Sequence, residues 1–267
     1  MATPAQIRQH YDDFAPIYRA FWGDHIHHGL FMRGDEKPEE AQVAMLKHCA
    51  ALLQRAPRQA LDVGCGHGGT AIFLAKQFGA VVDALTLSPS QRHLAQQNAE
   101  RAGVADRVQF SVADADQHNF PTTAYDLVWT MESSEHFCEK ARYFRNVTGT
   151  LEPGGRLLLA AWTGDMRNLA VREVASLFLC PELQSYTRYA EQISAAGLRL
   201  VVAEDLTEQV IRTWEICRHR ATAGRLAAWA LPAGIRAFVA GIDAIMAAYR
   251  SRELTYSVLV AEKSAQA

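Results

Sequence analysis

The sequence lacks the features by which membrane, secreted and nucleic-acid-binding proteins are most easily recognised. No uninterrupted apolar run could span a bilayer, and residues 1–10 lack the apolar core of a signal peptide. The five cysteines are odd in number and never form a Cys-x-x-Cys pair, which argues against a disulfide framework or a zinc site. A net charge of −2 gives no basic field for nucleic acid or anionic lipid. We therefore expect a cytoplasmic protein with a small-molecule substrate, no nucleic-acid partner, and at most weak peripheral membrane contact.

The order of strands and helices is the first positive feature. The composition, 49% hydrophobic and 21% charged over 267 residues, allows a full core and contains no internal repeat. Predicted strands cover 60–64, 80–85, 107–112, 125–130, 155–161, 198–206 and 254–262. Predicted helices cover 69–78, 88–102, 136–150, 166–179, 186–196 and the long stretch 208–250. This alternation predicts an α/β fold with a doubly wound, seven-stranded, mostly parallel sheet behind a helical N-terminal region.

A glycine-rich turn follows the first predicted strand. The segment 60–66 (ALDVGCG) leads into the helix at 69–78. Glycines there tolerate unusual backbone angles and leave space for a ligand against the backbone. The free N–H groups at the start of the helix add a partial positive charge. The turn therefore predicts a nucleotide-type cofactor at the edge of the sheet.

A dinucleotide cofactor is not favoured, because the acid that would hold its ribose is missing. A nicotinamide enzyme carries that acid at the tip of the next strand. Here the strand ends at Thr86 and Asp83 lies inside it. Asp62 instead places a carboxylate beside the glycine turn, which suits a ligand with an ammonium group, such as S-adenosyl-L-methionine. The alternative is that Asp62 only caps the turn.

Polar residues after the second and third strands fit the rest of such a cofactor. Thr86 and Gln91 could bind ribose hydroxyls, although Ser88 followed by Pro89 is also an ordinary helix N-cap. Asp114 ends the third strand, where its carboxylate could accept from an adenine amino group or cap the loop.

The segment after the fourth strand carries three candidates for a general base. Glu132, Glu135 and His136 lie where open α/β sheets bind their ligands. We expect His136 or Glu135, with Glu132 as support, to accept or orient the proton of the substrate. The alternative is that the acids cap the helix that follows.

Metal binding is not expected. Glu132, Glu135 and His136 offer no i, i+4 pair of ligands on a helix. The His-x-His-His cluster at residues 25–28 has no matching set of carboxylates and histidines elsewhere to complete a site.

The chain resembles class I S-adenosylmethionine-dependent methyltransferases, and within them the tocopherol C-methyltransferase group with its sterol and phenolic relatives. The resemblance rests on the segments 22–29 (WGDHIHHG), 62–66 (DVGCG), 86–89 (TLSP) and 131–136 (MESSEH). It implies an N-terminal helical lid over 1–57 and a cofactor-binding α/β core over 58–165. It also implies a remainder of the sheet over 166–267, with a helical substrate-binding insertion at about 207–250.

The resemblance also completes the set of expected site residues. Those expected at the cofactor are Asp62, Gly64, Cys65, Gly66, Thr86, Leu87, Gln91, Asp114, Ala115, Met131, Tyr11 and Tyr18. The two tyrosines, seven residues apart, could place electron-rich rings beside the sulfonium or simply pack. Those expected at the substrate and lid are Trp22, His27, His28, Trp162 and Tyr249.

The implied reaction is methyl transfer from S-adenosyl-L-methionine, leaving S-adenosyl-L-homocysteine, to a small and rather apolar acceptor. We favour C- or O-methylation of a phenolic or prenylated ring, with N-methylation of an amine or alkaloid-type molecule as the alternative. A cyclopropane-synthase-like lipid enzyme would call for a bicarbonate site and a basic membrane-facing surface. The missing ribose carboxylate argues against a nicotinamide oxidoreductase, and the intact glycine turn against a non-catalytic binding module.

Overall fold

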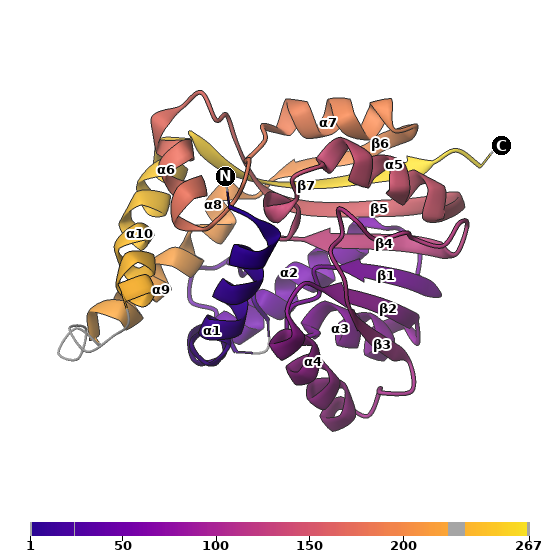
Figure 1. Cartoon of the computed structure of the whole chain (residues 1–267), viewed down its shortest axis with the longest axis horizontal. Helices are drawn as coiled ribbons and strands as arrows, with labels where there is room; N and C mark the ends of the chain where they lie inside the picture. Colours follow the sequence, from indigo (N-terminus) through magenta and orange to yellow (C-terminus); the bar gives the residue numbers. More distant parts are fainter. Residues whose placement is uncertain (1, 24, 224–232, 266–267) are drawn as a thin grey trace.

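Seven strands form one sheet, shown in Figure 1 as a computed structural model that describes residues 2–23, 25–223 and 233–265. The strands are β1 (Gln59–Val63), β2 (Val81–Thr86), β3 (Val108–Val112), β4 (Tyr125–Met131), β5 (Leu151–Gly164), β6 (Leu198–Asp205) and β7 (Leu254–Lys263). Their order is β3-β2-β1-β4-β5-β7-β6; β7 runs antiparallel to β5 and β6, and the other neighbouring strands are parallel. The predicted seven-stranded, mostly parallel sheet is confirmed.

Helices cover both faces of the sheet. They are α1 (Pro4–Trp22), α2 (Pro38–Leu52), α3 (Gly69–Phe78), α4 (Pro89–Ala102), α5 (Lys140–Thr150), α6 (Leu169–Leu177), α7 (Tyr186–Ala195), α8 (Thr207–Val210), α9 (Arg212–Ala223) and α10 (Ala233–Arg250). None of these described helices is long and apolar enough to cross a membrane. Residues 224–232 of the predicted insertion, and the side chains of 14–21 and 222–240, lie outside the described part of the chain.

The sheet separates two hydrophobic cores. Every residue of β4 is buried, because its alternate side chains enter opposite cores. Leu127 and Trp129 belong to the core that also contains side chains of α2, α3 and α4, while Val128 lies in the core beneath α5 and α7. The continuous apolar run in this strand therefore indicates burial on both sides.

Two predicted helices differ in their bounds. The helix predicted over 136–150 begins only at Lys140, because Ser134–His136 forms a short 3₁₀ turn, η1, and Asp116 accepts the backbone N–H groups of Cys138 and Glu139. The stretch 208–250 is divided into α8, α9 and α10 within the described residues. The 3₁₀ turn keeps Glu135 and His136 at the end of β4 instead of starting a helix there.

Helix α1 lies at the end of the sheet toward which the parallel strands run, as do α6, α9 and α10 (Figure 1). Asp12 ties α1 to the tip of β2, because its Oδ1 accepts from Ser88 Oγ at 2.5 Å and from Ser90 N at 3.3 Å. Ser88 is at the same time the N-cap of α4. The N-terminal helix is thus held across the opening of the site.

Candidate active site

A cavity of about 780 Å³, called here the cofactor cavity, lies at the ends of β1, β2, β3 and β4. Gly64 and Gly66 line it in left-handed backbone conformations, with φ of +87° and +52°. A Cβ on Gly64 would lie 2.1 Å from Cβ of Ser133, so no side chain fits at this position. The glycine turn is therefore required both by its backbone angles and by close approach to the segment after β4.

Most of the residues expected at the cofactor line this cavity. They are Gly64, Gly66, Thr86, Leu87, Gln91, Asp114, Ala115, Met131 and Tyr11. Thr86 Oγ1 donates to Gln91 Oε1 at 2.7 Å, which fixes both polar groups at the tip of β2. Ile7 of α1, Ile26 of the loop that follows α1, and Phe137 after η1 also line the cavity; they stand in or beside the sequence patterns but were not expected at the cofactor.

Asp62, Cys65 and Tyr18 do not line this cavity in the described residues. The Asp62 carboxylate is buried beneath the glycine turn and accepts from the backbone N–H of Ala71 in α3, while its Oδ2 has no partner. Burial raises the pKa of Asp62 to about 7, against the opposing effect of that hydrogen bond. Cys65 is buried in the core, and the side chain of Tyr18 lies outside the described residues.

The charge on the wall of the cofactor cavity distinguishes among cofactors. No lysine or arginine is found among the described residues that line it, whereas Asp114, Asp116 and Glu132 contribute three carboxyl groups. The N-terminus of α3 alone would have to offset the charge of a pyrophosphate here, because no cationic side chain among the described lining residues assists it and three carboxyl groups oppose it. A ligand with an ammonium and a sulfonium but no phosphate fits this wall, so the residues present suit S-adenosyl-L-methionine.

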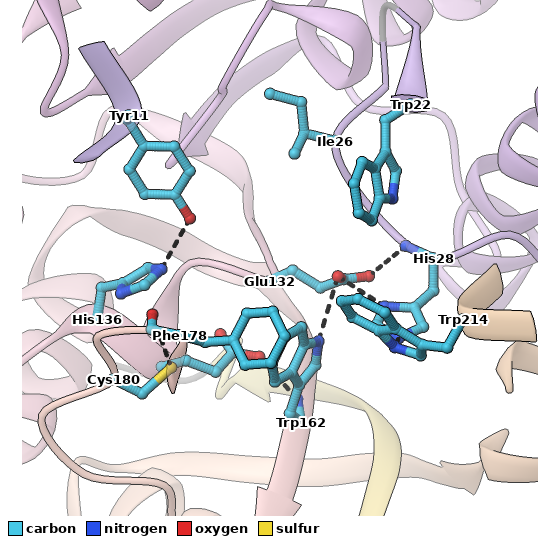
Figure 2. Close-up of a pocket in the computed structure, with 11 residues that line it drawn as sticks. Tyr11, Trp22, Ile26, His28, Glu132, His136, Trp162, Phe178, Cys180 and Trp214 are labelled. Carbon is cyan, nitrogen blue, oxygen red and sulfur yellow. Dashed lines mark hydrogen bonds and ion pairs between the residues drawn. The ribbon is translucent and has the colours of Figure 1, made fainter. Parts of the chain in front are cut away.

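A second cavity of about 530 Å³, called here the aromatic cavity, is shown in Figure 2. It is lined by Tyr11, Trp22, Ile26, His28, Glu132, Glu135, His136, Trp162, Phe178, Cys180 and Trp214. Four of these residues, Tyr11, Ile26, Glu132 and His136, also line the cofactor cavity. They form a shared wall between the two cavities.

The apolar side of the second cavity consists of rings that meet edge to face. Trp162 lies 5.1 Å from Phe178 and 5.9 Å from Trp214 between ring centroids, and Trp22 lies 5.8 Å from Trp214. Phe178, Cys180 and Trp214 were missed by sequence reasoning, because they lie outside any motif. For Trp214, the only signal was a tryptophan in the insertion between the last two strands.

Glu132 is the centre of the polar network on the shared wall. Its Oε1 accepts from His28 N at 2.7 Å and from the Tyr256 hydroxyl at 2.8 Å. Its Oε2 accepts from His28 Nδ1 at 2.8 Å and from Trp162 Nε1 at 3.2 Å. Burial raises the pKa of Glu132, and the hydrogen bonds from the imidazole and the backbone N–H of His28 lower it. A carboxylate offers about four acceptor sites. Because four donors occupy these acceptor sites, the Glu132 carboxylate is held in its ionised form. It has no free lone pair to accept a proton from the substrate.

The partners of His28 define its tautomer. The indole N–H of Trp214 points at His28 Nε2 over 2.6 Å, and an indole nitrogen can only donate. Nε2 must therefore carry the lone pair, and Nδ1 carries the proton that Glu132 accepts. The imidazole is neutral in this arrangement, so the His28–Glu132 pair keeps one negative charge.

His136 occupies the other side of the shared wall. Its Nδ1 faces the carbonyl oxygen of Leu179 at 3.3 Å and must donate to it, so Nε2 accepts from the Tyr11 hydroxyl at 2.8 Å (Figure 2). Burial lowers the pKa of His136 to about 4. A neutral imidazole with its lone pair directed at the junction of the two cavities has the geometry of a general base.

Glu135 differs from Glu132 in its protonation. Its Oε1 accepts from the backbone N–H of Trp162 at 2.7 Å, and burial raises its pKa to about 8. The carboxyl group is therefore protonated at neutral pH, where it can donate a hydrogen bond but cannot accept a proton. Trp162 bridges the two acids through its backbone and its indole.

The remaining expected substrate residues lie behind the wall. His27 is buried and its Nδ1 lies 2.8 Å from the carbonyl oxygen of His28, while the Tyr249 hydroxyl lies 3.4 Å from His28 Nε2. Neither lines the aromatic cavity in the described part of the chain, whereas Trp22, His28 and Trp162 do. Across the described residues, no group of three or more His, Cys, Asp or Glu side chains is arranged to hold a metal ion.

Comparison with known proteins decides the family. A family model described as mycolic acid cyclopropane synthetase matches residues 2–237. The chain belongs to this family. It is 32% identical over 228 residues to the 27-O-demethylrifamycin SV methyltransferase of Amycolatopsis mediterranei, covering 82% of each chain. It is 29% identical over 226 residues to a probable chloroplastic tocopherol O-methyltransferase of rice, covering 76% of this chain and 62% of that protein.

Solved structures show the same fold. The cyclopropane synthase MmaA2 from Mycobacterium tuberculosis superposes with a TM-score of 0.87 at 22% identity, covering 98% of this chain and 99% of that one. This likeness confirms the fold, whereas the family membership and the methyltransferase relatives confirm the predicted methyltransferase class and its cofactor, S-adenosyl-L-methionine. The roles of individual site residues remain predictions.

Proposed function

We propose that this protein transfers a methyl group from S-adenosyl-L-methionine to a small, largely apolar acceptor, with a phenolic or prenylated ring as the favoured class. The observation that carries this proposal is the wall shared by the cofactor and aromatic cavities. When bound, S-adenosyl-L-methionine supplies an electrophilic methyl group on positively charged sulfur. Rings of Trp22, Trp162 and Trp214 exclude water from the neighbouring cavity, which suits an apolar acceptor.

The residues of the cofactor cavity have distinct proposed roles. The glycine turn and the edge of β1 hold the amino acid end, with Asp62 supporting the turn from below. Thr86 and Gln91 hold the ribose, and Asp114 holds the adenine amino group. Tyr11 closes the cavity from α1, which acts as a lid held by Asp12.

His136 is the proposed general base. Its Nε2 lone pair lies at the shared wall and is held there by the hydrogen bond from Nδ1 to Leu179. An acceptor hydroxyl or a ring proton could take the place of the Tyr11 hydroxyl. Glu132 keeps its four donors throughout and orients His28 and Trp162 instead of accepting a proton.

The domain arrangement and compartment are also proposed. The lid over 1–57 and the insertion at about 207–250 both reach the aromatic cavity, through Trp22 and Trp214 respectively. All five cysteines are free, which supports a reducing compartment such as the cytoplasm.

The proposal is tested with cofactor carrying an isotopically labelled methyl group and a panel of phenolic, prenylated and amine acceptors. We expect labelled product from a ring-bearing acceptor, formed roughly 10²–10⁴-fold more slowly when His136→Ala replaces the wild type at equal enzyme concentration. Label transfer at the same rate in both proteins would refute the role of His136. Absence of calorimetric binding of S-adenosyl-L-homocysteine would refute the cofactor site.

A further inference from the structure

The aromatic cavity contains one uncompensated negative charge. Glu132 accepts from four donors, which hold its carboxylate in the ionised form, and its partner His28 is neutral because Trp214 donates to His28 Nε2. None of the described residues lining the aromatic cavity is a lysine or arginine. The nearby Lys140 ammonium is directed elsewhere, to the carbonyl oxygens of Phe137 at 2.6 Å and Glu182 at 2.8 Å.

The surroundings of this charge make its field strong. The Glu132 side chain is only 8% exposed, and the rings of Trp22, Trp162, Phe178 and Trp214 surround it in Figure 2. A charge in such a low-dielectric, water-poor cavity acts on a neighbouring ligand far more strongly than it would in bulk water. Hydrogen bonds from four neutral donors stabilise the carboxylate but do not cancel its charge.

Methyl transfer changes the charge of the acceptor by one unit. The electron pair of the acceptor forms the new bond to the methyl carbon, the pair of the broken S–C bond stays on sulfur, and the positive charge passes to the acceptor. A neutral ring carbon, alkene carbon or amine nitrogen thus becomes cationic, whereas a phenolate becomes neutral. A fixed carboxylate stabilises the first change and repels the phenolate that the second one requires.

We propose that the aromatic cavity selects an acceptor that is neutral when it binds and positively charged when methylated, through the carboxylate of Glu132. This proposal rests on the proposed function and narrows it to C-methylation of a neutral ring or alkene, or N-methylation of an amine. It excludes O-methylation through a free phenolate. After C-methylation, the lost ring proton would go to His136 Nε2, whose lone pair lies on the same wall.

The test compares two probes of equal shape and different charge, phenyltrimethylammonium and tert-butylbenzene. Each is titrated by intrinsic fluorescence, since three tryptophans line the cavity, with S-adenosyl-L-homocysteine saturating the cofactor cavity. We expect the wild type to bind the cation roughly tenfold more tightly than the neutral probe. In Glu132→Gln the two affinities should agree within about twofold, since the amide keeps the shape and loses the charge.

Glu191→Gln serves as the matched control, because Glu191 is exposed on α7 and forms an ion pair with Arg188, away from both cavities. It should keep the wild-type ratio. Equal binding of the two probes to the wild type, binding of neither, or a ratio that survives in Glu132→Gln each overturns the inference. If Glu132→Gln does not fold, the wild-type ratio alone decides. Failure of S-adenosyl-L-homocysteine to bind would instead refute the proposed function.

Discussion

The hydroxyl of Tyr11 donates to Nε2 of His136 over 2.8 Å, and this bond joins the lid helix α1 to the turn after β4. The two rings meet edge to face with centroids 5.5 Å apart. Both residues line both cavities. The lid is therefore connected to the proposed base at the point where cofactor and acceptor meet.

Replacing His136 should slow the reaction without weakening the binding of the cofactor. We expect His136→Ala to lower the turnover of a methylated acceptor by roughly 10²–10⁴-fold, the usual range for loss of a general base. Tyr11→Phe should lower it by about tenfold or less, since one neutral hydrogen bond is lost. Tyr186→Phe, at an exposed tyrosine on α7, should have no effect. Calorimetry with S-adenosyl-L-homocysteine checks binding, and near-full turnover of His136→Ala would count against the base.

The pH profile should be displaced toward acid. Burial, aided by His10 and Lys140, lowers the pKa of His136 to about 4, so its neutral form persists as the pH falls below 6.5. If the neutral imidazole accepts the proton, kcat/KM should stay level from pH 7 to about pH 5 and fall only near pH 4. A fall centred near pH 6.5, where an exposed histidine titrates, would show that the base is not this buried histidine.

The lid contact made by Asp12 should contribute to cofactor affinity. Asp12→Asn replaces a charged acceptor of the hydrogen bonds from Ser88 and Ser90, so the lid should open more often. We expect roughly tenfold weaker binding of S-adenosyl-L-homocysteine, with a faster dissociation rate in stopped-flow measurements. The control is Asp13→Asn, one residue further along the same helix, where the side chain is exposed and accepts a hydrogen bond from Gln9 of the same helix. Equal affinities of Asp12→Asn and Asp13→Asn for S-adenosyl-L-homocysteine would show that the lid contact does not contribute to cofactor binding.

Asp62 should make the fold less stable as the pH rises. Its pKa is raised by burial from 3.8 to about 7, so the protonated, folded state is favoured below pH 3.8 and this advantage is lost as the pH rises through 7. Asp62→Asn keeps an acceptor for Ala71 without the charge. Thermal unfolding should show the variant gaining stability over the wild type from pH 5 to pH 8, by about 1–3 kcal/mol. The exposed Asp106→Asn should show no such trend; a constant difference for Asp62→Asn would contradict the assignment.

The sequence predicted the sheet and much of the cofactor cavity, because both depend on local patterns. Apolar strands buried on two faces, glycines at a strand end and polar residues at strand tips are all readable within a few residues. Gly64, Thr86 and Asp114 line the cavity for this reason. Asp62 belongs to the same motif, yet its carboxylate is buried beneath the glycine turn and does not face the cavity. The position of a residue in a strand does not by itself determine the direction of its side chain.

The aromatic cavity could not be predicted in the same way. Glu132 was expected near the substrate, but its donors come from positions 28, 162 and 256, which only the tertiary fold brings together. Trp214 completes the network from α9, and its effect on the charge of His28 depends on a single contact. No local pattern encodes such contacts, because they join the lid, β5, β7 and the insertion.

The most direct test of the central claim is a crystal structure of the complex with S-adenosyl-L-homocysteine. We predict that the ligand fills the cofactor cavity, with its ribose at Thr86 and Gln91 and its adenine at Asp114. Its sulfur should face the shared wall, beside Glu132 and His136, with the aromatic cavity open on the other side. A sulfur atom directed away from that wall, or a ligand bound elsewhere, would contradict the account, because no acceptor in the aromatic cavity could then reach the methyl group.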